Sequence, residues 1–254
     1  MILAAHQPSY LPWLGYLAKI AAADVFVVMD DLQYEAQNFQ NRNRLKSNQG
    51  AIWAQVPLYR GSQGDRIDEK RICNDGNPRE HWQRRTWNML QIHYGRAPHF
   101  SLYREALEDL YTRPWTSLLE LDLHVLGLFM RWFEITRPVL RSSSLALGGM
   151  KTERILDLCK KTGARTYLSG RGGSVDYLDV QLLANAGVTV DWQSFRHPTY
   201  SQRYPALGFV SHLSALDLLL NCGPSSAGIL RASMTDTDGA RELQFKMTGS
   251  ASKE

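Results

Sequence analysis

The sequence of 254 residues is poor in cysteine and has no long apolar run. Its three cysteines, Cys73, Cys159 and Cys222, are odd in number and scattered, and no CxxC pair is present. The cysteine pattern therefore predicts neither a disulfide framework nor a zinc site. No apolar run approaches the roughly 18 residues that a membrane span needs. No basic segment precedes the first apolar stretch, so we expect no signal peptide and a cytoplasmic location.

The charge of the chain is mildly basic, with a formal net charge of +4 and a pI near 9.0. Arginines cluster at Arg42 and Arg44 and again at Arg84 and Arg85. Such a surface suits an anionic substrate, an acyl or peptidyl carrier protein with its phosphopantetheine arm, or RNA such as an aminoacyl-tRNA. Ordinary solvated surface charge explains the same pattern equally well.

The opening of the chain predicts a β-loop-α-β unit. Residues 1–5 and 25–29 are apolar runs of strand length, and a helical pattern covers residues 14–23. Between them, Pro8 and Pro12 fix φ and remove backbone donors, which predicts a loop. Two strands joined in this way are expected to be parallel, with a right-handed crossover.

Strand and helix patterns continue along the chain. Further strands are predicted over residues 51–58, 67–72, 139–140, 166–169 and 188–194. Helices are predicted over residues 78–94, 102–111, 115–133, 151–162, 180–186 and 211–221. Together they predict an α/β fold with a mostly parallel, Rossmann-like sheet and a helical middle insertion. We expect a single catalytic domain over residues 1–233, its helical part at about 78–136, and a disordered tail over 234–254.

The loop after the first strand is the leading candidate site. It presents His6, Gln7, Tyr10 and Trp13 beside two prolines, after a strand and before a helix. Ligands of open parallel sheets bind at this position, and a helix N-terminus attracts anions. We favour a functional site over a rigid turn.

Polar residues also follow the second strand. Asp30, Asp31 and Gln33 are expected near His6. The carboxylates could orient the histidine, bind a metal or bind a substrate ammonium. Successive residues point to opposite faces, so only one carboxylate is expected to face the site. The pattern does not choose between them.

Three later segments carry further candidate residues. Asn41, Arg42 and Arg44 form a basic stretch that could bind phosphate or carboxylate, or be a solvated connector. Ser169 and Gly170 open a glycine-rich loop that ends in Tyr177; it is neither a Walker motif nor GxGxxG. His197, Tyr200 and Gln202 follow another strand, where His197 could be a general base or a hydrogen-bonded structural residue.

These residues resemble the WbqC-like family. The match begins with His6-Gln7-Pro8-x-Tyr10-x-Pro12-Trp13-x-Gly15-Tyr16. It continues through Lys19, Asp30-Asp31, Gln33, Asn41-Arg42-Asn43, Tyr167-Leu168-Ser169-Gly170, Tyr177 and His197-Pro198-x-Tyr200-x-Gln202. The resemblance implies a biosynthetic role, such as that of bacterial O-antigen enzymes, and glycyl transfer to an amino sugar.

A weaker similarity links the opening to nucleotidylyltransferase-type folds, including pantothenate synthetase. Those enzymes have a His-x-x-His or His-x-Gly-His motif where this chain has Trp13-Leu14-Gly15-Tyr16. The missing histidines argue against ATP chemistry but not against a shared fold.

Our leading hypothesis is an amide-forming acyl or aminoacyl transferase acting on a small amine. His6 would be the base or would position the amine, with Asp30 or Asp31 orienting it. Amides near Ser169 and Gly170 would stabilise the oxyanion, and Lys19, with the two arginines of the basic stretch, would hold an anionic substrate or carrier. The alternatives are an ATP- and magnesium-dependent ligase, and a non-catalytic protein that binds a carrier or RNA.

Overall fold

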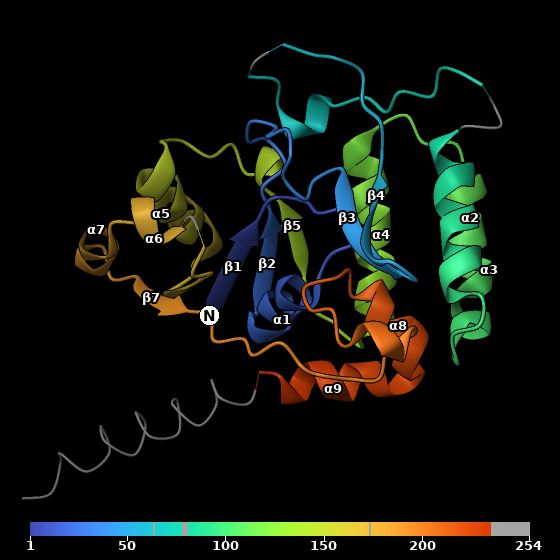
Figure 1. Ribbon diagram of the computed structural model, residues 1–254. Coiled ribbons are helices and arrows are strands. Elements are labelled where there is room, and N and C mark those ends of the chain that lie inside the picture. Colours follow the sequence, from blue (N-terminus) through green and yellow to red (C-terminus); the bar gives the residue numbers. More distant parts are fainter. Residues whose placement is uncertain (63, 78–80, 173, 235–254) are drawn as a thin grey trace, which may run out of the picture.

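The computed structural model describes residues 1–62, 64–77, 81–172 and 174–234. Its main sheet contains β1 (Ile2–His6), β2 (Val25–Val28), β5 (Val139–Arg141), β6 (Thr166–Ser169) and β7 (Thr189–Trp192). All four pairings are parallel, in the order β5-β2-β1-β6-β7 (Figure 1). This order places the first strand at the centre and reverses direction between β1 and β6, as in doubly wound folds. The predicted Rossmann-like α/β fold is confirmed.

Alternating apolar residues give the sheet two buried faces. Leu3 and Val27 point to the face that α5 (Lys151–Thr162) and α7 (Val180–Asn185) cover. Ala4 and Phe26 point to the other face, where they pack with α1 (Leu14–Ala22). Strands buried on both sides need continuous apolar runs, which explains the composition of β1 and β2.

A long segment between β2 and β5 forms the middle insertion. It contains an antiparallel hairpin of β3 (Arg42–Ser47) and β4 (Gly50–Gln55). Three helices follow: α2 (Trp82–Tyr94), α3 (Phe100–Thr112) and α4 (Leu118–Trp132). Figure 1 shows this insertion on the opposite side of the sheet from α5 and α7. The predicted helical insertion is therefore present, with a hairpin at its start.

The last helices close the fold. Helix α8 (Leu216–Cys222) contacts β3 and α3, and α9 (Ser226–Ala232) contacts α1. The short helix α6 (Ser174–Tyr177) follows β6. Single 3-10 turns occur at Ile67–Glu69, Ser142–Ser144, Pro205–Leu207 and Gly223–Ser225. Among the helices that the structure describes, none is both long and apolar enough to cross a membrane.

Two predicted elements are wrong. Within residues 67–72, Ile67–Glu69 form a 3-10 turn, and Arg71 and Ile72 make only isolated bridges, to Ser117 and Leu58. The basic stretch at 41–46, for which the pattern left an anion-binding segment and a connector open, is largely strand β3. The helix predicted from residue 211 begins only at Leu216, since His212 adopts a φ of 58°. The predicted helix start at Pro78 and the tail from residue 235 lie outside the described residues.

Asp122 on α4 is a buried carboxyl group without a partner. It is 1% exposed, and neither carboxylate oxygen has a hydrogen bond within the described chain. Burial raises its pKa well above the ordinary value of 3.8, so the folded protein keeps it protonated. The hydroxyl of Tyr16 on α1, whose pKa an ionised Asp122 would raise, is also buried and unpartnered.

We expect Asp122→Asn to weaken the pH dependence of stability. Above pH 4 the unfolded chain ionises Asp122 while the folded chain does not, so the wild type loses stability as the pH rises. Relative to the variant, the free energy of unfolding of the wild type should fall by on the order of 1 kcal/mol per pH unit. Urea unfolding at pH 5, 6 and 7 measures it. Equal pH slopes for the two proteins would contradict a protonated Asp122.

Candidate functional site

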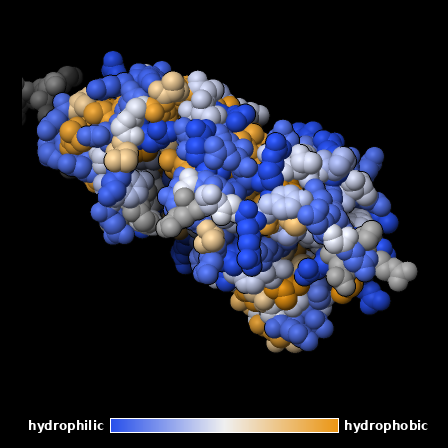
Figure 2. Space-filling model, turned by 90° about the horizontal axis from the view of Figure 1, so that it is seen from above, coloured by the Kyte–Doolittle hydropathy of each residue, from blue (hydrophilic) through white to orange (hydrophobic). Residues whose placement is uncertain are grey.

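A cavity with two lobes lies where β1 and β6 end, at the reversal of strand order. The first lobe has a volume of about 600 Å³ and the second about 560 Å³. Both are lined by His6, Trp13, Tyr16 and Lys19. Figure 2 views the molecule from this edge and shows a largely hydrophilic surface on which apolar side chains form small separate patches. The cavity occupies the position where doubly wound sheets bind their ligands.

The two lobes differ in their remaining lining residues. The first lobe is further lined by Ala5, Gln7, Pro8, Ser9, Met29, Leu32, Glu35, Asn38, Phe39, Gln40, Arg44, Ile155, Tyr167, Tyr177 and His212. The second is further lined by Gly15, Gly170, Arg171, Gly172, Gln193, Ser194 and Phe195. Glu35 is the single carboxylate among these residues, so the second lobe has none.

The loop between β1 and α1 is held by hydrogen bonds to the segment before β3 and to β3 itself. The Tyr10 amide donates to the Phe39 carbonyl at 3.0 Å, and the Asn43 side-chain amide donates to the Leu11 carbonyl at 2.7 Å. Leu11 has a φ of 46°, a left-handed conformation that is costly for a branched side chain. These hydrogen bonds stabilise that conformation and fix the loop beside the cavity.

His6 presents an unprotonated nitrogen to the cavity. Its Nδ1 is 3.0 Å from the Gln7 carbonyl, which can only accept, so Nδ1 carries the proton. Nε2 has no partner in the described residues, and the ring is open to the lobes. Surrounding protein and the charge of Lys19 lower its pKa to about 4, against the raising effect of the Gln7 carbonyl. The Nε2 lone pair is therefore available at neutral pH.

Lys19 is a buried ammonium without a counter-ion. Its side chain is 4% exposed, and Nζ donates to the Ala5 carbonyl at 3.1 Å. No ion pair involves Lys19 within the described chain. Burial lowers its pKa to about 8. The group thus remains largely charged at neutral pH, at the wall that the two lobes share.

A chain of hydrogen bonds orients Gln7. The Glu35 backbone amide can only donate, and it lies 3.1 Å from Gln40 Oε1. Gln40 must therefore donate through Nε2, which it does to Gln7 Oε1 at 2.9 Å. Gln7 Nε2 is left without a partner in the described structure. The first lobe gains a fixed amide donor next to His6.

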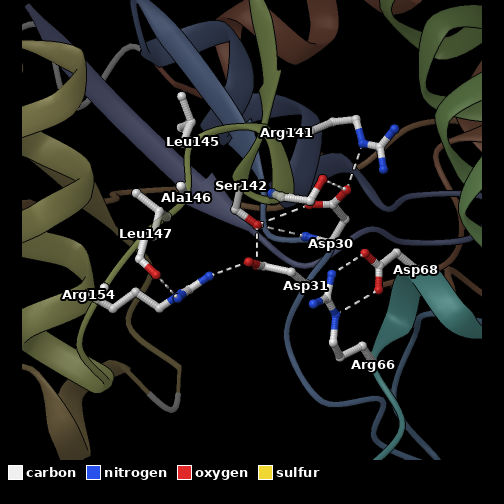
Figure 3. A network of polar contacts seen from close by, with 12 residues as sticks. Asp30, Asp31, Arg66, Asp68, Arg141, Ser142, Leu145, Ala146, Leu147 and Arg154 are labelled. Atoms are coloured by element: carbon white, nitrogen blue, oxygen red, sulfur yellow. Dashed lines mark hydrogen bonds and ion pairs between the residues drawn. The ribbon is translucent and has the colours of Figure 1, made fainter.

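The predicted role of Asp30 and Asp31 in orienting His6 is wrong. Asp30 is fully buried and accepts from Arg141 Nε at 2.6 Å, and Asp31 forms an ion pair with Arg154 (Figure 3). Ser142 lies between the two carboxylates. Both side chains are engaged by residues of β5, of the turn after it and of α5, and neither is among the residues that line the cavity.

The pKa of Asp30 reflects this network. Burial alone would raise it, but hydrogen bonds from Ser143, Arg141 and Ser142 outweigh burial and lower the pKa. The carboxylate therefore stays ionised as part of a structural network that ties the end of β2 to β5.

His197 is not placed to be a general base. Its Nε2 accepts from the His212 backbone amide at 3.1 Å, so its Nδ1 must donate to the Pro198 carbonyl at 2.9 Å. Both ring nitrogens are occupied. Burial lowers its pKa, partly opposed by the Pro198 contact, which agrees with a neutral ring. The catalytic prediction for His197 is wrong because the ring has no lone pair to offer.

Tyr200 and Gln202 support the fold behind the site. Tyr200 donates to Asp217 at 3.0 Å, and Gln202 Nε2 donates to Asp217 at 2.8 Å. Lys46 on β3 completes this network by donating to Gln202 Oε1 at 3.1 Å. Neither predicted binding residue lines a lobe.

Five other predicted binding residues also lie outside the cavity. Their side chains bond or pack elsewhere: Tyr10 with Tyr111, Asn41 with the Val56 carbonyl, Arg42 over Trp53, and Ser169 with the Gly170 carbonyl, while Gln33 is exposed and bridges to Arg66. The structure brings together His6, Gln7, Trp13, Lys19, Arg44, Gly170 and Tyr177.

Several residues that line the cavity were not among the predicted site residues. Glu35 and Gln40 follow the end of β2, and polar residues after a strand end indicate a site at that edge of the sheet. Tyr16 was part of the opening motif. Arg171 lay inside the glycine-rich loop. His212 had no signal, because a predicted helix covered it. Within the described part of the chain, no group of three or more His, Cys, Asp or Glu residues could hold a metal ion.

Comparisons with known proteins give a family and one relative. The family model described as the WbqC-like protein family matches residues 7–229. The uncharacterized protein Rv1507c of Mycobacterium tuberculosis is 32% identical over 232 residues, which cover 90% of this chain and 97% of that protein. No solved structure matches the chain significantly.

We expect the His6 imidazole to titrate near pH 4, and Lys19→Met to raise its pKa. The variant removes the positive charge that disfavours protonation of the ring. NMR titration of the His6 Cε1 proton, assigned with His6→Gln, measures both values. The exposed lysine variant Lys160→Met should leave the titration unchanged. An ordinary pKa near 6.5 for His6 in the wild type would contradict the effect of the surrounding protein and of Lys19 on the ring.

Proposed function

Since the chain belongs to the WbqC-like protein family, we propose that it is an enzyme that forms an amide by transferring an acyl or aminoacyl group to a small amine. The observation that carries the proposal is the His6 imidazole. Its Nδ1 proton is fixed by the Gln7 carbonyl, and its Nε2 lone pair faces a cavity with room for two substrates. A group that removes a proton from an attacking amine needs this arrangement.

The proposed step uses His6 as base and then as acid. The amine nitrogen attacks the acyl carbonyl carbon and forms the C–N bond, while His6 Nε2 accepts the amine proton. The bond from the acyl carbon to the leaving sulfur or oxygen then breaks, and the leaving group takes the proton from His6. A neutral ring with a lowered pKa returns this proton readily.

The Gln7 amide supports the same step. Gln40 fixes its orientation, so Nε2 is available to donate to the carbonyl oxygen as negative charge develops. Glu35, the carboxylate of the first lobe, attracts a cationic amine, which loses one proton to solvent before its neutral nitrogen attacks. Glycyl transfer to an amino sugar, the role that the family resemblance suggests, fits these features. Both a carrier-protein thioester and an aminoacyl-tRNA supply a suitable donor.

A second candidate is an ATP- and magnesium-dependent ligase. The strand order and the glycine-rich turn at the reversal point favour it, since phosphates bind there in many doubly wound folds. Calorimetry with ATP and magnesium distinguishes the two, because the ligase requires nucleotide binding and pyrophosphate release.

His6→Ala is expected to lower the rate of amide formation roughly 100-fold or more. The assay offers the glycyl thioester of N-acetylcysteamine, a minimal carrier mimic, and an amino sugar, and detects the amide by mass spectrometry. His81→Ala changes a histidine that lines neither lobe; it is the matched control and should retain wild-type turnover. Undiminished turnover of the His6 variant would contradict its role as base, and binding without turnover in the wild type would favour a delivery protein.

A further inference from the structure

The second lobe combines positive charge with an absence of acidic groups. Lys19 and Arg171 line it, and neither forms an ion pair with a residue that the structure describes. No aspartate or glutamate is among its lining residues. The first lobe differs, because Glu35 lines it.

The turn after β6 faces the Lys19 ammonium. A Cβ atom built on Gly170 would lie 3.7 Å from Lys19 Nζ. Because glycine has no Cβ, the backbone of the turn borders this nitrogen directly. The amides of Gly170, Arg171 and Gly172 donate no hydrogen bond to other described residues. Consecutive unpaired amides beside a cation are a suitable environment for an oxyanion.

Lys46 is another buried lysine of this chain, and its ammonium group has more polar partners than that of Lys19. Lys46 is fully buried, but Nζ donates to Gln202 Oε1 at 3.1 Å and to the Gly208 carbonyl at 2.7 Å. Burial lowers the pKa of Lys46, and the negative charge of Asp217 opposes this effect by favouring the charged form. Lys19 has one neutral acceptor and no carboxylate. A buried charge without a counter-ion is unfavourable, and a bound anion would relieve it.

We propose that the second lobe binds the anionic group of a ligand, a carboxylate or a phosphate. Lys19 Nζ is the counter-ion, the amides of residues 170–172 are the donors, and Arg171 adds charge at the opening. Within the proposed function, on which this placement rests, the group belongs to the acyl donor, whose carbonyl carbon then lies between this lobe and the amine near Glu35.

The test measures binding of inorganic phosphate and of acetate by calorimetry at constant ionic strength, without any turnover. The wild type should bind at least one of them, and the tighter probe identifies the group. Lys19→Met should weaken that binding roughly tenfold or more, because a charge-assisted hydrogen bond in a buried site is lost. Arg171→Ala should weaken it about threefold, since this side chain is exposed.

Two controls separate this inference from folding and from the proposed reaction. Lys160→Met removes an exposed lysine and should bind like the wild type, and thermal unfolding should show that Lys19→Met is folded. His6→Ala should retain binding even though its turnover is lost. Failure of both probes to bind the wild type, or equal binding by folded Lys19→Met, would overturn the anion site, whatever the outcome of the transfer assay.

Discussion

The hydrogen bond from Lys19 to the Ala5 carbonyl places a positive charge without a counter-ion at the end of the central strand. Two properties of the site depend on this positive charge. The charge helps to keep the neighbouring His6 unprotonated, so a lone pair faces the cavity at neutral pH. It also adds positive charge to the second lobe, and no aspartate or glutamate is among the described residues that line that lobe. The reversal of strand order between β1 and β6 opens the space in which both properties meet a ligand.

The insertion between β2 and β5 completes this site rather than lying apart from it. Asn43 on β3 holds the loop that follows β1, and Gln40, just before β3, fixes the Gln7 amide. Arg44 lines the first lobe and donates to the His212 carbonyl at 3.1 Å, which connects the hairpin to the loop before α8. Three segments distant in sequence therefore hold the cavity in one shape, as a preorganised site requires.

Much of the sheet could be predicted from the sequence because doubly buried strands have continuous apolar runs. Strand ends also located His6 and Gly170. Side-chain direction could not be predicted: Asp30 follows a strand beside β1, yet its partners Arg141 and Ser142 are more than a hundred residues away. His197 lies beside His212, whose amide occupies its ring, and that contact depends on a loop that was predicted as helix. Such partners are fixed only by tertiary packing.

Lys19 is buried and has no counter-ion among the described residues, so its titration should respond to a bound anion. The most direct measurement is an NMR titration of the Lys19 Cε methylene in a ¹³C-labelled sample, assigned by comparison with Lys19→Met. We expect a pKa of about 8 for Lys19 in the ligand-free protein and a higher pKa when an oxyanion is added. A titration at the ordinary lysine value of 10.5, unchanged by anions, would contradict it.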